Sequence, residues 1–229
     1  MDEVRNNGDK ALANFAKKYD GVKVDIDKFM VEREDIDKAY EKVNEDEVSA
    51  LKYSKRRIED FQKSLLKRLK FRWYYGGKDV KVINLALPIE SVGCYVPGGY
   101  SPYPSSLLMA VVPAKVAKVP RIAVCSPPMS DGKLNPILLV AADICGVDEI
   151  HKVGGAHAIA ALAYGTESIK PVKKIVGPGN KYVTTAKIIA SKDVAVDMPA
   201  GPSEILILAD DSANPVSYTH LTLPTKRIV

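Results

Sequence analysis

Four loops rich in glycine and proline have the composition of a binding edge for an anionic ligand. They span residues 96–99, 153–157, 176–180 and 199–203. Glycines let backbone N–H groups approach an anion, and a helix that follows such a loop presents a partially positive N-terminus. Tight turns alone would explain any one of these loops. Their recurrence favours several loops meeting at one ligand.

Four single residues in or beside these loops are candidates for direct contact with that ligand. Tyr95 ends an aliphatic run, where its ring could cover a base or a ribose or simply close the rim of a core. His157 would lie near a helix N-terminus, as a ligand contact or as a structural histidine. Asn180 could cap a helix or turn its amide to a ligand, and Ser203 presents the same choice.

Other chemistry finds less support in the sequence. The dinucleotide fingerprint GxGxxG and the P-loop are both absent. The three histidines, at 151, 157 and 220, assemble no zinc motif, and we therefore expect no metal ligands in this chain. Cys94 and Cys125 end apolar runs, where an inert buried thiol is favoured over a nucleophile.

Two styles of structure must position these residues. Residues 1–80 contain no proline, whereas all 15 prolines follow. Apolar residues recur at helical spacing before a stop at Asp20-Gly21, again over 36–43, and on one face of a stretch from about Val48 to Trp73. We therefore expect a helical N-terminal arm over residues 1–80.

From residue 81 onward, strand-like runs alternate with Gly/Pro clusters and helix-like segments. The expected strands are 92–96, 121–125, 149–153, 174–176 and 204–210. Spacings of about 25 residues are typical of βα units. The fold class predicted is α/β, with a parallel, Rossmann-like sheet covered by helices over residues 81–215. Residues 216–229 break the pattern, and we interpret them as a non-native tail.

Composition narrows the function classes. With 46% hydrophobic and 27% charged residues and no apolar run of membrane-spanning length, the chain is expected to be a cytoplasmic globular protein that binds no membrane. The net charge of +5 leaves a nucleic-acid-binding helix as an alternative, based on Lys55-Arg56-Arg57 and on 63–72. Glu59 and Asp60 interrupt that basic stretch and favour an ordinary solvated helix face.

Long segments around the four loops closely resemble histidinol dehydrogenase, the family that catalyses the last step of histidine biosynthesis. The segments are 92–99, 153–167, 176–184 and 197–204, in the family's order, and the match spans about residues 2–215. The resemblance implies an aldehyde-dehydrogenase-like fold and NAD-dependent oxidation of L-histidinol to L-histidine through L-histidinaldehyde. It also implies zinc as a cofactor and a homodimer.

The resemblance assigns roles residue by residue. Tyr95 and Asn180 match NAD-contacting positions, His157 stands where many members have an NAD-contacting glutamine, and Ser203 matches a substrate-contacting serine. The family's zinc ligands and acid/base pair follow the point where this match ends. We therefore expect an incomplete, N-terminal portion cut at Pro215, with no catalytic residues and no activity alone. A thiol-dependent NAD aldehyde dehydrogenase, using Cys94 or Cys125, is the alternative enzyme.

Overall fold

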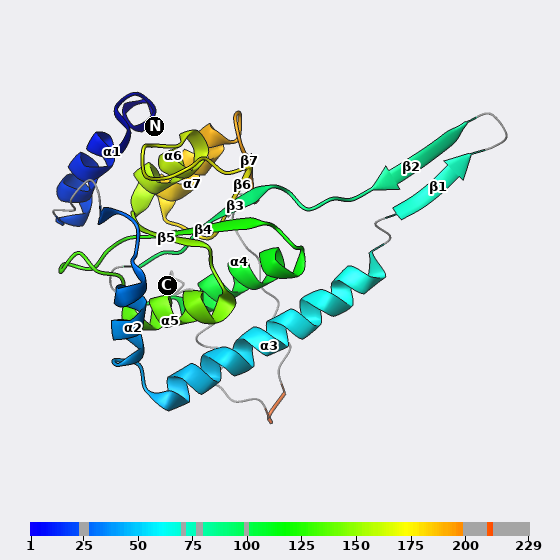
Figure 1. Ribbon diagram of the computed structural model, residues 1–229, viewed down its shortest axis with the longest axis horizontal. Coiled ribbons are helices and arrows are strands. Elements are labelled where there is room, and N and C mark those ends of the chain that lie inside the picture. Colours follow the sequence, from blue (N-terminus) through cyan, green and yellow to red (C-terminus); the bar gives the residue numbers. More distant parts are fainter. Residues whose placement is uncertain (23–27, 70–71, 77–79, 99–100, 199–209, 213–229) are drawn as a thin grey trace, which may run out of the picture. The chain divides into compact units, whose positions relative to one another are not determined.

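The computed structural model describes residues 1–22, 28–69, 72–76, 80–98, 101–198 and 210–212. Residues 1–199 form one compact unit and residues 200–229 a second. In the second unit Asp210 accepts a hydrogen bond from the backbone N–H of Ser212 at 2.9 Å. The first unit contains the helices and the sheet that position the candidate site (Figure 1).

Four helical elements open the chain. They are α1 (Asp2–Phe15), the π-helical turn η1 (Ala16–Asp20), α2 (Arg33–Tyr40) and α3 (Glu45–Arg68). The expected stop at Asp20-Gly21 is confirmed, because Gly21 takes the left-handed conformation with φ of 69°. Asn44 begins α3 with a capping box, in which it and Glu47 satisfy each other's backbone N–H groups.

The third helix ends earlier than its apolar periodicity suggests. The backbone becomes extended at Leu69, and β1 (Arg72–Gly76) pairs antiparallel with β2 (Lys81–Leu85). The expected helix over 48–73 was therefore too long. All five residues of β2 are exposed. The β-branched residues at 82 and 83 are typical of a strand, but this strand buries neither of its faces.

The larger sheet among the described residues of the first unit has five strands, all parallel. They are β3 (Ser91–Tyr95), β4 (Arg121–Ser126), β5 (Glu149–Lys152), β6 (Lys174–Val176) and β7 (Ala195–Val196). Their spatial order is β5-β4-β3-β6-β7. Counted from β3, this is the 3-2-1-4-5 order of dinucleotide-binding folds, in which the chain reverses direction across the sheet between β3 and β6.

Helices cover both faces of the sheet (Figure 1). The crossover helices are α4 (Pro104–Val116), α5 (Pro136–Cys145), α6 (Gly155–Tyr164) and α7 (Lys181–Ala190). Helices α2 and α3 pack on α5 and α4, whereas α1 packs on α6 beside α7. Two core layers result, one around Leu107, Val111 and Leu138, the other around Ile159 and Leu162.

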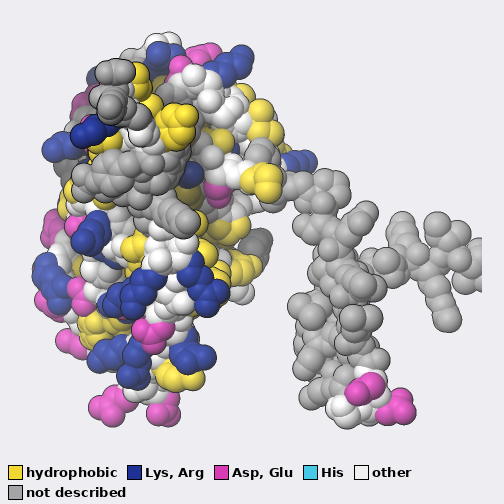
Figure 2. Space-filling model, turned by 90° about the vertical axis from the view of Figure 1, so that its right-hand side faces the viewer, with side chains coloured by type: hydrophobic (Ala, Val, Ile, Leu, Met, Phe, Trp, Pro, Cys, Tyr) yellow, Lys and Arg dark blue, Asp and Glu magenta, His cyan; other side chains and the backbone are white. Residues whose placement is uncertain are grey.

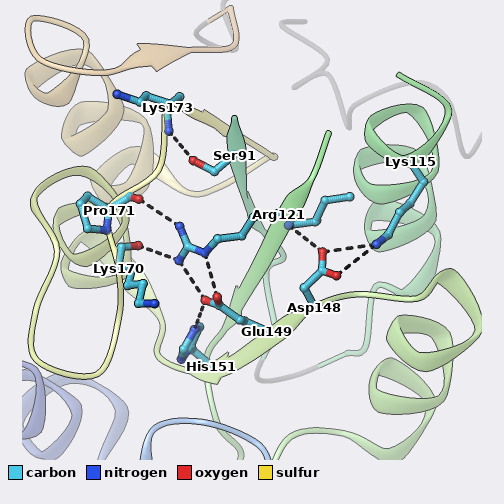
Figure 3. Close-up of polar contacts among 10 residues, drawn as sticks. Ser91, Lys115, Arg121, Asp148, Glu149, His151, Lys170, Pro171 and Lys173 are labelled. Carbon is cyan, nitrogen blue, oxygen red and sulfur yellow. Dashed lines mark hydrogen bonds and ion pairs between the residues drawn. The ribbon is translucent and has the colours of Figure 1, made fainter. Parts of the chain in front are cut away.

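Ion pairs and backbone hydrogen bonds fix the amino-terminal edge of the sheet (Figure 3). At the start of β4, Arg121 donates two hydrogen bonds to the carboxylate of Glu149 at 2.7 and 2.9 Å, and others to the carbonyls of Lys170 and Pro171. Ser91 accepts the backbone N–H of Lys173. These contacts lie opposite the carboxyl-terminal edge, at which open parallel sheets bind ligands.

The parallel α/β sheet is confirmed, with four of the expected strands present at close to their expected bounds. The fifth, over 204–210, falls almost entirely outside the described residues. The short strand β7 was not predicted because its two residues, Ala195 and Val196, carry too little pattern to be recognised.

Candidate functional site

The carboxyl ends of β3 and β6 meet in tight backbone contact. Gly177, directly after β6, has a φ of 126°, and a Cβ atom there would overlap the carbonyl oxygen of Tyr95 at the end of β3. Only glycine allows both that conformation and that approach. This contact lies where the strand order reverses, which is the place at which open parallel sheets bind ligands.

Tyr95 connects this point to a second loop. Its side-chain hydroxyl accepts a hydrogen bond from the backbone N–H of Gly155 at 3.1 Å, in the first turn of α6. The ring is buried, and burial raises the pKa of the Tyr95 phenol to about 12. The phenol is therefore neutral at physiological pH.

His157 lies in the first turn of α6 and is enclosed by the N-terminal helices. Its ring centroid is 5.8 Å from that of Phe15, and its Nε2 atom is 3.5 Å from a carboxylate oxygen of Asp20. Only 5% of the residue is exposed. Among the described residues, neither that Nε2 atom nor that oxygen of Asp20 has a hydrogen-bond partner of good geometry, so both keep capacity for one.

Asn180 caps α7. Its Oδ1 atom accepts the backbone N–H groups of Tyr182 at 3.0 Å and Val183 at 3.1 Å. The residue is exposed, and no described residue accepts a hydrogen bond from its Nδ2 group. The two roles considered for Asn180 are thus compatible, because the oxygen caps the helix while the amide donor faces solvent.

A small hollow lies at the carboxyl ends of β3 and β4. It is lined by Pro97, Gly98, Ser126, Pro127 and Asn135, among others. The Ser126 hydroxyl is buried and has no hydrogen-bond partner among the described residues. The candidate Ser203 falls outside the described residues. Tyr95 contacts Gly155 in the first turn of α6, which contains His157, and Gly177 in the loop that leads to Asn180. The role of Ser203 stays a prediction from sequence.

Three charged residues at this edge were missed by sequence reasoning. Asp20 appeared only as part of a helix stop, yet the π-helical turn that contains it packs against His157; such turns are frequent at functional sites. Lys187 and Asp197 contact Gly177 from the far end of α7 and from after β7. A lysine among the apolar residues of α7 was the one signal available for this pair.

The cysteines do not support the thiol alternative. Cys94 and Cys125 are fully buried in neighbouring strands. Burial raises the pKa of the Cys94 thiol to about 12, and burial raises that of Cys125 as well. A thiol held neutral and away from solvent is a poor nucleophile.

Metal and nucleic-acid sites find no support in the described part of the chain. No group of three His, Cys, Asp or Glu side chains gathers there as metal ligands, so these residues do not fit a zinc ion. On the face shown in Figure 2, basic and acidic side chains intermingle, and on α3 Lys63 forms an ion pair with Glu59. None of the described helices is long and apolar enough to cross a membrane.

Comparison with known proteins identifies the family. The family model for histidinol dehydrogenase matches residues 1–220. The chain is 47% identical to the histidinol dehydrogenase of Archaeoglobus fulgidus and 49% to that of Methanococcus maripaludis, each match covering 93% of this chain and 52% or 50% of the relative.

A solved structure gives the same result. The crystal structure of histidinol dehydrogenase from Elizabethkingia anophelis superposes with a TM-score of 0.85 at 39% identity, covering 93% of this chain and 49% of that one. The chain spans about half the length of the curated relatives it matches. At such identity and coverage, the chain belongs to the histidinol dehydrogenase family.

Proposed function

We propose that this chain supplies the dinucleotide-binding half of an enzyme that oxidises L-histidinol through L-histidinaldehyde to L-histidine. The observation that carries the proposal is the contact of Gly177 with Tyr95 where the strand order reverses. It brings a tyrosine and the loop before an asparagine-capped helix to the edge where such sheets bind ligands. The activity itself is proposed for a protein of the relatives' full length.

Tyr95, His157 and Asn180 are the proposed NAD contacts. NAD, when bound, supplies the hydride acceptor for alcohol and aldehyde oxidation. The neutral hydroxyl of Tyr95 would donate a hydrogen bond to the dinucleotide, and the Nδ2 group of Asn180 would donate another. The N-termini of α6 and α7 would favour the negative charge of the pyrophosphate. Ser203 is proposed to contact histidinol.

Zinc is proposed only for the complete enzyme. The described residues do not fit the metal, because they bring no three suitable ligands together. None of them is therefore assigned to zinc or to acid/base chemistry. The catalytic groups are proposed to come from a segment that follows this one in a full-length protein.

We further propose that the complete enzyme is a homodimer with a fold akin to the aldehyde dehydrogenases. The five-stranded order supports the fold proposal. Large apolar side chains exposed on α3 and β2 support the dimer, because a subunit interface would bury them: Phe61, Leu65, Val82, Ile83 and Leu85. Sedimentation equilibrium tests the dimer, with Ile83→Lys expected to yield monomers and Lys81→Gln as a control expected to leave the dimer intact.

Genetic complementation tests the enzymatic proposal. A gene that encodes this chain continued to the length of its relatives should rescue a histidine auxotroph that lacks histidinol dehydrogenase. Its purified product should form NADH when histidinol is added. If the continued protein is folded but neither rescues growth nor forms NADH, the proposed function is wrong.

A further inference from the structure

A buried lysine and an aspartate hold both backbone polar groups of Gly177. Lys187 lies on α7 with only 5% of its surface exposed, and its Nζ atom donates to the carbonyl oxygen of Gly177 at 2.9 Å. The Oδ2 atom of Asp197 accepts the N–H of the same residue at 2.8 Å. The Lys187 ammonium and the Asp197 carboxylate are also in ion-pair contact.

An ordinary turn does not require a charged pair of side chains on its backbone. Most turns are closed by backbone hydrogen bonds or by neutral side chains, and lysine is rarely buried unless it is paired. Here an ammonium and a carboxylate from two separate segments converge on one residue. Because each charge neutralises the other, loss of Asp197 leaves a buried ammonium uncompensated, and loss of Lys187 leaves a partly buried carboxylate without its partner.

The position of Gly177 determines where the loop after it lies. A Cβ atom at 177 would overlap the Tyr95 carbonyl, so the loop is in direct contact with β3. Three residues later Asn180 caps α7, the same helix from which Lys187 reaches back. The ion pair therefore ties the start of the loop to the helix at its end and to the segment after β7.

We propose that Lys187 and Asp197 are positioning residues for dinucleotide binding. They hold the 177–180 loop in the shape in which the Asn180 amide and the N-terminus of α7 meet the ligand, and they do not touch it themselves. This inference rests on the proposed function, since it assigns NAD to this edge. It adds two residues to the four candidates that the sequence indicated.

Steady-state kinetics of the continued protein test the proposal. Asp197→Ala and Lys187→Met should each raise the KM for NAD about tenfold, while the KM for histidinol and kcat change less than twofold. Asp197→Asn should raise the KM for NAD less than Asp197→Ala, because its amide oxygen can still accept the Gly177 N–H. Lys192→Met is the matched control, since Lys192 is exposed just after α7, and it should change nothing.

Other outcomes overturn the proposal. An unchanged KM for NAD in folded Asp197→Ala and Lys187→Met variants contradicts it, as does an equal rise in both KM values, which would indicate a general structural role.

A second measurement separates this inference from the enzymatic proposal. Hydrogen exchange of the Gly177 amide in the 229-residue chain needs no activity, and Asp197→Ala should accelerate it about tenfold while Lys192→Met leaves it unchanged. Unaltered exchange would contradict the proposal that Lys187 and Asp197 hold Gly177 in place. If exchange becomes faster but the folded, continued protein does not oxidise histidinol, the assigned role in NAD binding and the proposed function are wrong, while the contacts of Lys187 and Asp197 with Gly177 still stand.

Discussion

The hydroxyl of Tyr95 accepts the backbone N–H of Gly155 at 3.1 Å, which joins the end of β3 to the first turn of α6. Tyr95→Phe removes this acceptor and leaves the Gly155 N–H without its partner. We expect unfolding free energy to fall by about 1 kcal/mol, typical of one hydrogen bond, and the KM for NAD to rise. Denaturant unfolding and initial rates measure the two effects. A variant with unaltered stability and unaltered KM would refute both roles of the hydroxyl.

Asn180→Ala should combine two losses. The helix cap contributes about 1 kcal/mol, and one hydrogen bond to NAD corresponds to about a tenfold change in its KM. Asn180→Ser should keep the cap but not the amide donor, so it should retain stability and still raise the KM for NAD.

Asn44→Ala is the matched control for this cap. Asn44 caps α3 in a similar manner, by accepting the backbone N–H of Glu47 at 2.7 Å. Its loss should lower stability by a similar amount without a change in the KM for NAD. If Asn180→Ser binds NAD as the wild type does, Asn180 is a cap alone.

The 229-residue chain alone should form no NADH from histidinol, even with zinc and NAD present. Its described residues bring no three metal ligands together, so added zinc could bind only at scattered side chains and could not orient the substrate. A coupled absorbance assay with and without a chelator checks this. Zinc-dependent turnover would show that catalytic residues lie within this chain.

The Arg121–Glu149 pair predicts how stability changes in acid. Arg121 lowers the pKa of the Glu149 carboxyl below its usual 4.5. Because the folded-state pKa is the lower one, the pair stabilises the fold fully above about pH 4.5, and this contribution is lost as pH falls through the lowered value. Denaturant unfolding at several pH values should show a shallower acid decline for Glu149→Gln than for the wild type. Identical slopes would contradict the assignment.

The sequence could predict what depends on local pattern. Runs of β-branched residues before Gly/Pro clusters located β3 to β6 to within about one residue, and the cap at Asn180 followed from its place before a helix. The antiparallel pair of β1 and β2 was not predicted because the apolar period of α3 continues past its end at Arg68. The exposed β2 also lacks the alternation that a half-buried strand shows.

Contacts between distant segments could not be read from the sequence in the same way. Asp20 and His157 are brought together only when α1 packs on α6, and Lys187 and Asp197 meet at Gly177 only when β7 pairs with β6. These partners are set by the tertiary fold, and apart from the lysine among the apolar residues of α7 neither spacing nor residue type marks them. The roles of Tyr95, His157, Asn180 and Ser203 in binding remain predictions.

Hydrogen exchange with and without NAD tests most directly whether this edge of the sheet is the dinucleotide site. In the protein continued to the relatives' length, NAD should slow exchange of backbone amides over 95–98, 154–157 and 177–180, at the carboxyl ends of the strands. Amides at the opposite edge, near Arg121 and Glu149, should exchange at unchanged rates. Protection confined to that opposite edge, or none at the three loops under conditions in which NAD is turned over, would contradict the account.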